Sequence, residues 1–89
     1  MAFYVVHHKV KDFDAWKKAY DSFASTRKQY GVEEHYAIQS VDHPNEITVV
    51  GEGKMDSIQK FLNSSDLKTR MESAGVVGAP DVFIGNNKK

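Results

Sequence analysis

Hydrophobic and polar residues change their spacing several times along the 89-residue chain, and each change predicts a new element. Residues 3–10 are rich in β-branched and aromatic side chains, a composition typical of a strand. One set of alternating positions in this strand holds Tyr4, Val6, His8 and Val10. The other set begins with Phe3 and Val5. Because both sets begin with apolar residues, we expect cover on both faces of the strand.

A helix is predicted next, starting at Asp12 or Asp14 and ending before Gly31. Large side chains recur in it at spacings of three and four residues, which places them on one face. They are Phe13, Trp16, Tyr20, Phe23, Arg27 and Tyr30. This stripe is predicted to pack against the sheet.

The second half of the chain predicts a hairpin, a divided helix and a last strand. Residues 32–41 and 47–51 are the expected hairpin strands, joined by turn residues around Pro44. Asp56 is the expected cap of a second helix, with Gln59 in the capping-box position. Polar residues 63–66 interrupt this helix, and Ser65 can cap its continuation toward Gly75. Pro80 should end a loop before a short strand at residues 81–84.

This β-α-β-β-α-β order favours a ferredoxin-like α+β fold, a four-stranded antiparallel sheet with the helices on one face. We expect one such domain over residues 1–89. Two helices can cover only one face of the sheet, so the other face, with its valines and aromatic residues, would be exposed in a monomer. Packing two sheets face to face would bury it, and we therefore expect a homodimer through the sheet face.

Composition narrows the classes of function. Twelve basic and twelve acidic residues give a net charge of zero, which disfavours nucleic acid or a membrane surface as the main partner. The absence of cysteine excludes disulfides, thiolate metal sites and cysteine nucleophiles. The apolar run at residues 3–6 is too short to span a bilayer, and we expect a cytoplasmic protein.

Histidines are the candidate catalytic groups, because imidazole titrates near neutral pH. His8 shares its strand face with Tyr4 and could act as a general base in a pocket under the helices. The alternative is a core histidine that is hydrogen-bonded to backbone or to Tyr20. His35 is a second candidate, with Tyr36 expected on the opposite face of its strand. No metal site is expected, because His7 and His8 point to opposite faces.

Aromatic side chains are the candidate walls of a binding site. Trp16, Tyr20 and Phe23 lie at helical spacing, so core packing alone accounts for such a stripe. The same side chains could also line a cavity for a flat ligand, with Tyr4 or Tyr36 donating a hydrogen bond to an anionic oxygen.

Three segments, residues 8–16, 42–46 and 74–83, resemble the small dimeric α+β-barrel proteins grouped with antibiotic-biosynthesis monooxygenases and cyclase-like domains. The resemblance extends from Phe3 to about Ile84 and implies a pocket between sheet and helices in each subunit. That group includes cofactor-free monooxygenases, haem-degrading enzymes, cyclases and isomerases. The monooxygenases of this group use a set of Trp, Asn, Tyr and Arg residues in their pocket. This chain has Trp16, which lies on a different element from their tryptophan, and Asn63, which lies in a position comparable to their asparagine.

Two hypotheses of function follow. The first is an enzyme, a cofactor-independent monooxygenase or a cyclase/isomerase, acting on an aromatic or polyketide-like molecule with His8 as base. The second is a non-catalytic dimer that binds a small ligand or has a stress or regulatory role. RNA binding by the same fold is disfavoured, because residues 47–51 contain no aromatic side chain for base stacking.

Overall fold

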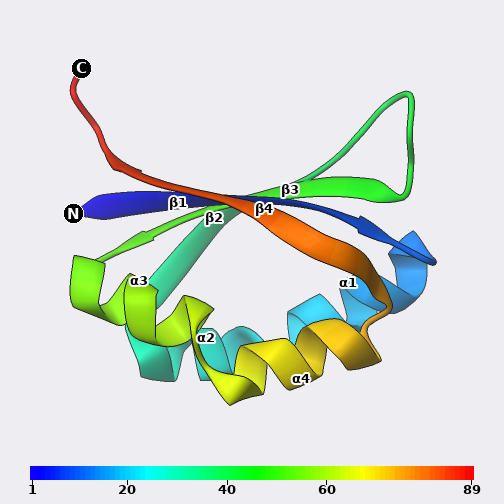
Figure 1. Ribbon diagram of the computed structural model, residues 1–89, viewed down its shortest axis with the longest axis horizontal. Coiled ribbons are helices and arrows are strands. Elements are labelled where there is room, and N and C mark those ends of the chain that lie inside the picture. Colours follow the sequence, from blue (N-terminus) through cyan, green and yellow to red (C-terminus); the bar gives the residue numbers. More distant parts are fainter.

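The computed structural model describes all residues 1–89. It contains a four-stranded antiparallel sheet, and four short helices cover one face of this sheet. Its elements in chain order are β1 (Ala2–Val10), α1 (Phe13–Ser22), α2 (Ala24–Tyr30), β2 (Val32–Gln39), β3 (Glu46–Gly53), α3 (Met55–Leu62), α4 (Ser65–Ser73) and β4 (Val76–Asn86). The strand order is β2-β3-β1-β4. This is the predicted ferredoxin-like arrangement (Figure 1), in which the first helix is divided in two as well as the second.

The first helix is shorter than predicted, because it breaks at Phe23. Asp12 caps its start by accepting a hydrogen bond from the Ala15 amide. Near its end, the Ser22 hydroxyl donates to the Ala19 carbonyl oxygen, a local bond of the kind that competes with helix continuation. Phe23, at the break, is buried in the core. The chain then resumes as α2, which ends at Gly31 in a left-handed conformation.

The second pair of helices is divided where expected, but its caps differ from the prediction. Lys54 is the N-cap of α3, and Asp56 lies in the first turn, where its charge favours the helix dipole. Ser64, and not Ser65, caps α4 by accepting from the Leu67 amide. The capping-box prediction for Asp56 was therefore wrong by two residues.

The last strand is much longer than predicted, because Pro80 lies inside it. β4 is an edge strand, where a proline costs no ladder hydrogen bond if its missing N–H faces outward. Its register against β1 jumps between His7 and Lys9, so that residues 78–80 stand opposite His8. Gly78, at φ 72°, supplies the left-handed backbone in this bulge.

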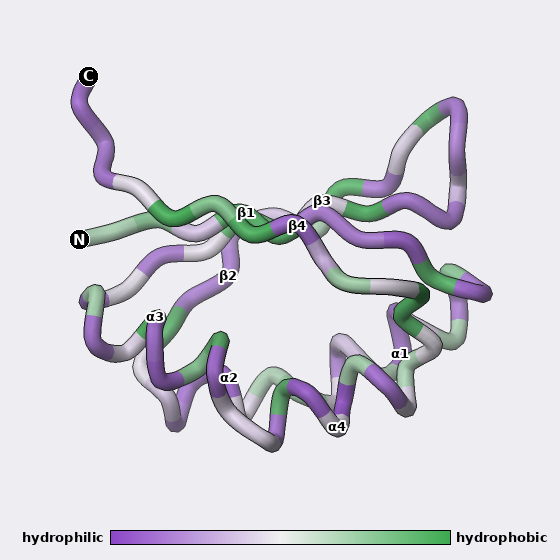
Figure 2. The backbone as a smooth tube through the Cα atoms, in the orientation of Figure 1, coloured by the Kyte–Doolittle hydropathy of each residue, from purple (hydrophilic) through white to green (hydrophobic).

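The two faces of the sheet have different surroundings. Tyr4, Val6, His8 and Val10 point toward the helices, as their alternation predicted, and are buried. The opposite face of the sheet is not covered by any helix (Figure 1). Figure 2 shows hydrophobic segments of β1 and β4 meeting in the middle of the sheet. No helix is long and apolar enough to cross a membrane.

β2 differs from its prediction in length and in regularity. It ends at Gln39, and its register against β3 slips by one residue between Glu34 and Tyr36. This β-bulge at His35 changes the facing of the residues after it. The prediction that His35 and Tyr36 lie on opposite faces was wrong, because the extra residue brings both to the uncovered face, where His35 meets Glu52.

Candidate functional site

A small cavity lies between the helix-covered face of the sheet and the helices. Its volume is about 50 Å³, and most of its lining is hydrophobic. A space of this size admits a few water molecules but is smaller than an aromatic ring requires, roughly 150 Å³ in a cavity known to bind benzene. The polar groups on its wall are therefore the features that can carry chemistry.

Five of the seven predicted site residues line this cavity. They are Tyr4, His8, Trp16, Tyr20 and Phe23. The other two, His35 and Tyr36, lie on the uncovered face of the sheet. His35 Nε2 is 2.7 Å from a Glu52 carboxylate oxygen, and Tyr36 is 63% exposed. The cavity thus brings together the candidates on β1, on α1 and at the break between α1 and α2, but neither of the β2 candidates.

His8 is buried at the cavity wall and has no hydrogen-bond partner at either ring nitrogen. The alternative that it is bonded to backbone or to Tyr20 is therefore wrong for this structure. Its ring lies 5.5 Å from the Trp16 ring between centroids. Burial, with a smaller contribution from His7, lowers the pKa of His8, so the imidazole is neutral at neutral pH. Neutral imidazole offers one acceptor and one donor to whatever enters the cavity.

Trp16 and Tyr20 form the aromatic floor beside His8. Their rings are stacked with centroids 4.8 Å apart, and the Arg27 guanidinium lies 4.1 Å above the Tyr20 centroid. Burial and the nearby Glu34 carboxylate raise the pKa of Tyr20 well above its ordinary value. The Tyr20 hydroxyl is thus protonated at any physiological pH.

Tyr4 reaches across a neighbouring strand to a buried carboxylate. Tyr4 on β1 pairs with Gly51 on β3, and Gly51 pairs with Glu34 on β2. The Tyr4 hydroxyl donates a 2.7 Å hydrogen bond to Glu34 Oε2. A Cβ atom on Gly51 would lie only 2.4 Å from the Tyr4 ring, so the missing side chain makes room for this contact. Burial and Glu34 raise the pKa of Tyr4 far above its ordinary value.

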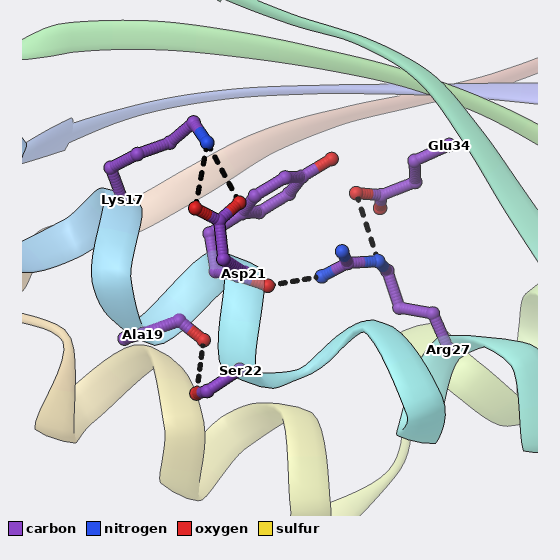
Figure 3. A network of polar contacts seen from close by, with 7 residues as sticks. Lys17, Ala19, Asp21, Ser22, Arg27 and Glu34 are labelled. Atoms are coloured by element: carbon purple, nitrogen blue, oxygen red, sulfur yellow. Dashed lines mark hydrogen bonds and ion pairs between the residues drawn. The ribbon is translucent and has the colours of Figure 1, made fainter.

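Arg27 provides the positive charge beside this carboxylate. Figure 3 shows it reaching from α2 toward Glu34, with its Nε 3.6 Å from Glu34 Oε1. Its Nη1 donates to the Tyr20 carbonyl oxygen at 2.8 Å. The Glu34 side chain is only 6% exposed, and Oε1 accepts no hydrogen bond. In the same figure, Lys17 and Asp21 form an exposed pair within α1.

Sequence reasoning missed Glu34 and Arg70 as cavity residues and did not assign Arg27 a role. Arg27 had a usable signal, since it falls in the aromatic stripe, where a charge needs a buried partner. Glu34 had no such signal, because a glutamate next to another acidic residue is normally predicted to be exposed to solvent. Arg70 lies on α4, stacked 5.2 Å over Phe23, and donates to the Ser22 hydroxyl at 3.2 Å.

One group of side chains could hold a metal ion, on the uncovered face. Glu33, His35 and Glu52 have potential ligand atoms within 4.8 Å of one another. The histidines His7, His8 and His35 do not form a second such group, because His8 lies on the other face of the sheet from the remaining two.

Comparison with protein families relates the sequence to one group. The family described as "Domain of unknown function (DUF3764)" matches residues 2–80. No curated protein matches the sequence.

Several solved structures have backbones similar to that of this chain, and some of them are described as antibiotic biosynthesis monooxygenases. SnoaB, a cofactor-independent oxygenase from Streptomyces nogalater, has TM-score 0.80 and 11% identity over 99% of this chain and 93% of its own. A conserved protein from Methanosarcina mazei has TM-score 0.75 and 19% identity over 99% and 94%. An antibiotic biosynthesis monooxygenase has TM-score 0.78 and 9% identity over both complete chains. At these identities the likeness establishes the shared fold, as the resemblance implied.

Replacing Gly51 with alanine should destabilise the protein, because the added Cβ forces the Tyr4 ring away from Glu34. Overpacking of this kind costs about 1 to 3 kcal/mol of unfolding free energy. Urea denaturation measures it. The matched control is Gly85→Ala, where the nearest atoms belong to the exposed Phe83 side chain. Equal stability of the two variants would contradict the role given to Gly51.

The buried His8 should make stability fall in acid. Its folded-state pKa lies below the ordinary 6.5, so the unfolded chain binds a proton more readily. This contribution is complete above about pH 6.5 and declines as pH falls toward the folded-state pKa, by about 1.4 kcal/mol for each unit of lowering. His8→Gln should lose less stability between pH 7 and pH 5 than the unmodified protein. The other histidines are present in both proteins and cancel. Parallel pH profiles would contradict the assignment.

Proposed function

We propose that this chain, which belongs to the family described as "Domain of unknown function (DUF3764)", oxidises a ring-bearing small molecule in its cavity without a cofactor. The observation that carries the proposal is His8, a buried imidazole with both nitrogens unpaired on an aromatic cavity wall. The description of SnoaB, which shares the fold, as a cofactor-independent oxygenase supports the same chemistry.

His8 acts as the general base in this reaction. Neutral imidazole removes a proton from an acidic C–H or phenol O–H of the ligand and leaves an electron-rich anion. With anthrone as a probe substrate, the anion reduces dioxygen to a bound hydroperoxide, which loses water to give anthraquinone. One dioxygen is consumed for each quinone and each water formed. The enzyme supplies the base, the orientation and an environment that stabilises the anion.

Stabilisation of the anionic oxygen falls to Arg70 in this proposal. Tyr4 was the expected donor, but its hydroxyl is committed to Glu34, and Tyr36 lies outside the cavity. Arg27 is already balanced by the Glu34 charge. Arg70 is a cavity residue that forms no ion pair and donates only to the Ser22 hydroxyl, a neutral partner.

Entry of a ring requires part of the wall to move, and α4 is the part proposed to move. Leu67, Arg70 and Met71 of this helix line the cavity, yet none of its residues is fully buried. Two side-chain hydrogen bonds connect α4 to the other helices. One runs from Arg70 to the Ser22 hydroxyl, and the other, at 3.0 Å, from the Tyr30 hydroxyl to Asp66. Few buried contacts are the physical signature of a segment that opens locally.

A non-catalytic ligand-binding role is the second candidate, and it is favoured by the absence of a catalytic partner at His8, whose ring nitrogens accept and donate no hydrogen bond. Such a protein would bind a ligand at His8 without consuming oxygen. Binding and oxygen uptake therefore separate the two candidates.

We also propose a homodimer in which the uncovered sheet faces pack together. Large apolar side chains on this face are exposed, including Phe83 at 70% and Ile38 at 52%. They continue into Phe3, Val5 and Val50, which together with Phe83 border a shallow depression on the same face. Apolar surface of this kind is buried by association in small domains.

Oxygen uptake with anthrone tests the catalytic proposal. His8→Gln should lower kcat/KM by about 100-fold or more, the usual contribution of a general base. His43→Gln, at an exposed turn position, is the matched control and should be unaffected. The acid limb of the pH profile should lie below the ordinary histidine value of 6.5, because burial lowers the pKa of His8. Unchanged turnover in His8→Gln would refute the role of the base, and anthrone binding without oxygen uptake would favour the second candidate.

Sedimentation equilibrium tests the dimer. Phe83→Glu should raise the dimer dissociation constant by at least about tenfold, because it buries a charge in the apolar interface. Val82→Glu is the matched control, since Val82 is 48% exposed on the same strand but points to the other face of the sheet. A monomeric unmodified protein, or equal effects of the two variants, would contradict this interface.

A further inference from the structure

We propose that Glu34 forms a second polar end of the cavity and that the ligand donates a hydrogen bond to its Oε1 atom. The ligand would then be an elongated ring system with a hydroxyl or amino group opposite the group that faces His8. This inference rests on the proposed function of the cavity and goes beyond it by naming a chemical group that the ligand must carry.

The Glu34 carboxylate is buried with one oxygen satisfied and the other not. Oε2 accepts the 2.7 Å bond from the Tyr4 hydroxyl. Oε1 accepts none, although the side chain is only 6% exposed and lines the cavity. A buried carboxylate oxygen without a donor is costly, and such groups in native proteins call for an explanation. A donor supplied from the cavity would complete the coordination of this oxygen.

The neighbouring cation does not fill this role. Arg27 Nε stays 3.6 Å from Oε1, beyond a good hydrogen bond. Its guanidinium is held by the bond to the Tyr20 carbonyl oxygen and by its position over the Tyr20 ring. Arg27 therefore balances the charge of Glu34 while leaving the oxygen open.

Tyr20 is the rival donor from the protein itself. Glu34 contributes to raising the pKa of Tyr20, so the Tyr20 hydroxyl faces the same carboxylate. The Tyr20 hydroxyl lies near the carboxylate without donating a hydrogen bond to Oε1. If it competes with the ligand for Oε1, its removal should strengthen the ligand contact.

The strand positions that carry His8 and Glu34 are separated along the sheet, which favours an elongated ligand. Along β3, their partners are Ile47 and Gly51, four residues apart, or about 13 Å in an extended strand. Trp16 and Tyr20 line the cavity together with these two groups, but they stack on each other and Arg27 covers the Tyr20 ring, so a ligand would meet mainly their edges. The two ends also differ chemically, since Glu34 accepts only and neutral His8 both accepts and donates.

Calorimetric titration with naphthalene-2,6-diol, 6-methoxynaphthalen-2-ol and naphthalen-2-ol tests the inference. The unmodified protein should bind the diol about tenfold or more tightly than the methyl ether, because a methoxy group cannot donate to a carboxylate. This comparison needs no variant. Equal affinities for the diol and its ether would overturn the inference.

Variants then locate the effect. Glu34→Gln keeps an oxygen for Tyr4 but removes the charge, and it should abolish the preference for the diol. Tyr20→Phe should retain or increase the preference, whereas Tyr30→Phe, whose hydroxyl bonds Asp66, should leave it unchanged. A preference that survives in Glu34→Gln, or one that vanishes in Tyr20→Phe, would refute the assignment to Glu34 Oε1.

The outcomes also separate this inference from the proposed function. Binding of naphthalen-2-ol that depends on His8, without preference for the diol, leaves the proposed function standing and refutes the Glu34 contact. A preference for the diol that depends on Glu34 but not on His8 supports the Glu34 contact and refutes the base. Absence of binding by all three compounds refutes both.

Discussion

The burial of one carboxylate, Glu34, organises the helix-covered side of this protein. A buried anion is tolerated only when charge and hydrogen bonds compensate it. The compensation comes from Tyr4 on β1 and Arg27 on α2, and the phenol can reach Glu34 only because Gly51 stands between them on β3. Four elements are thereby held in one register around a single side chain. Arg27 in turn covers Tyr20, whose ring stacks on Trp16 and fixes the aromatic floor of the cavity.

The cavity that results has incomplete polar bonding at two places. His8 is neutral and unpaired because burial disfavours its charged form and no protein group reaches it. Glu34 stays beside a cation, but one of its oxygens accepts nothing. An apolar core of this size would be more stable if both groups were satisfied or absent. The presence of these two incompletely bonded groups beside aromatic side chains is the physical basis for assigning a ligand to the cavity.

Alternation along the strands separates this site from the other face of the sheet. The same period of two that turns His8 inward turns His7 outward, where it contacts Thr48 and Glu46. The outward face combines exposed apolar residues with His–Glu pairs, whereas the inward face holds the cavity. A protein this small cannot cover both faces with its own four short helices, and this limit is what makes association through the outer face a physical expectation.

Local pattern alone determined much of this protein. The order of elements, the facing of His8 and the aromatic stripe on the first helix follow from residue periodicity, which backbone geometry converts directly into facing. Tertiary structure decided the rest. Phe23 ends a helix because it packs in the core, Pro80 lies in a strand because β4 is at an edge, and the bulge at His35 moves two candidates away from the cavity. Arg27 pairs with Glu34, and His8 lacks a hydrogen-bond partner, because of how distant segments of the chain pack together. The spacing of residues along the sequence does not encode such packing.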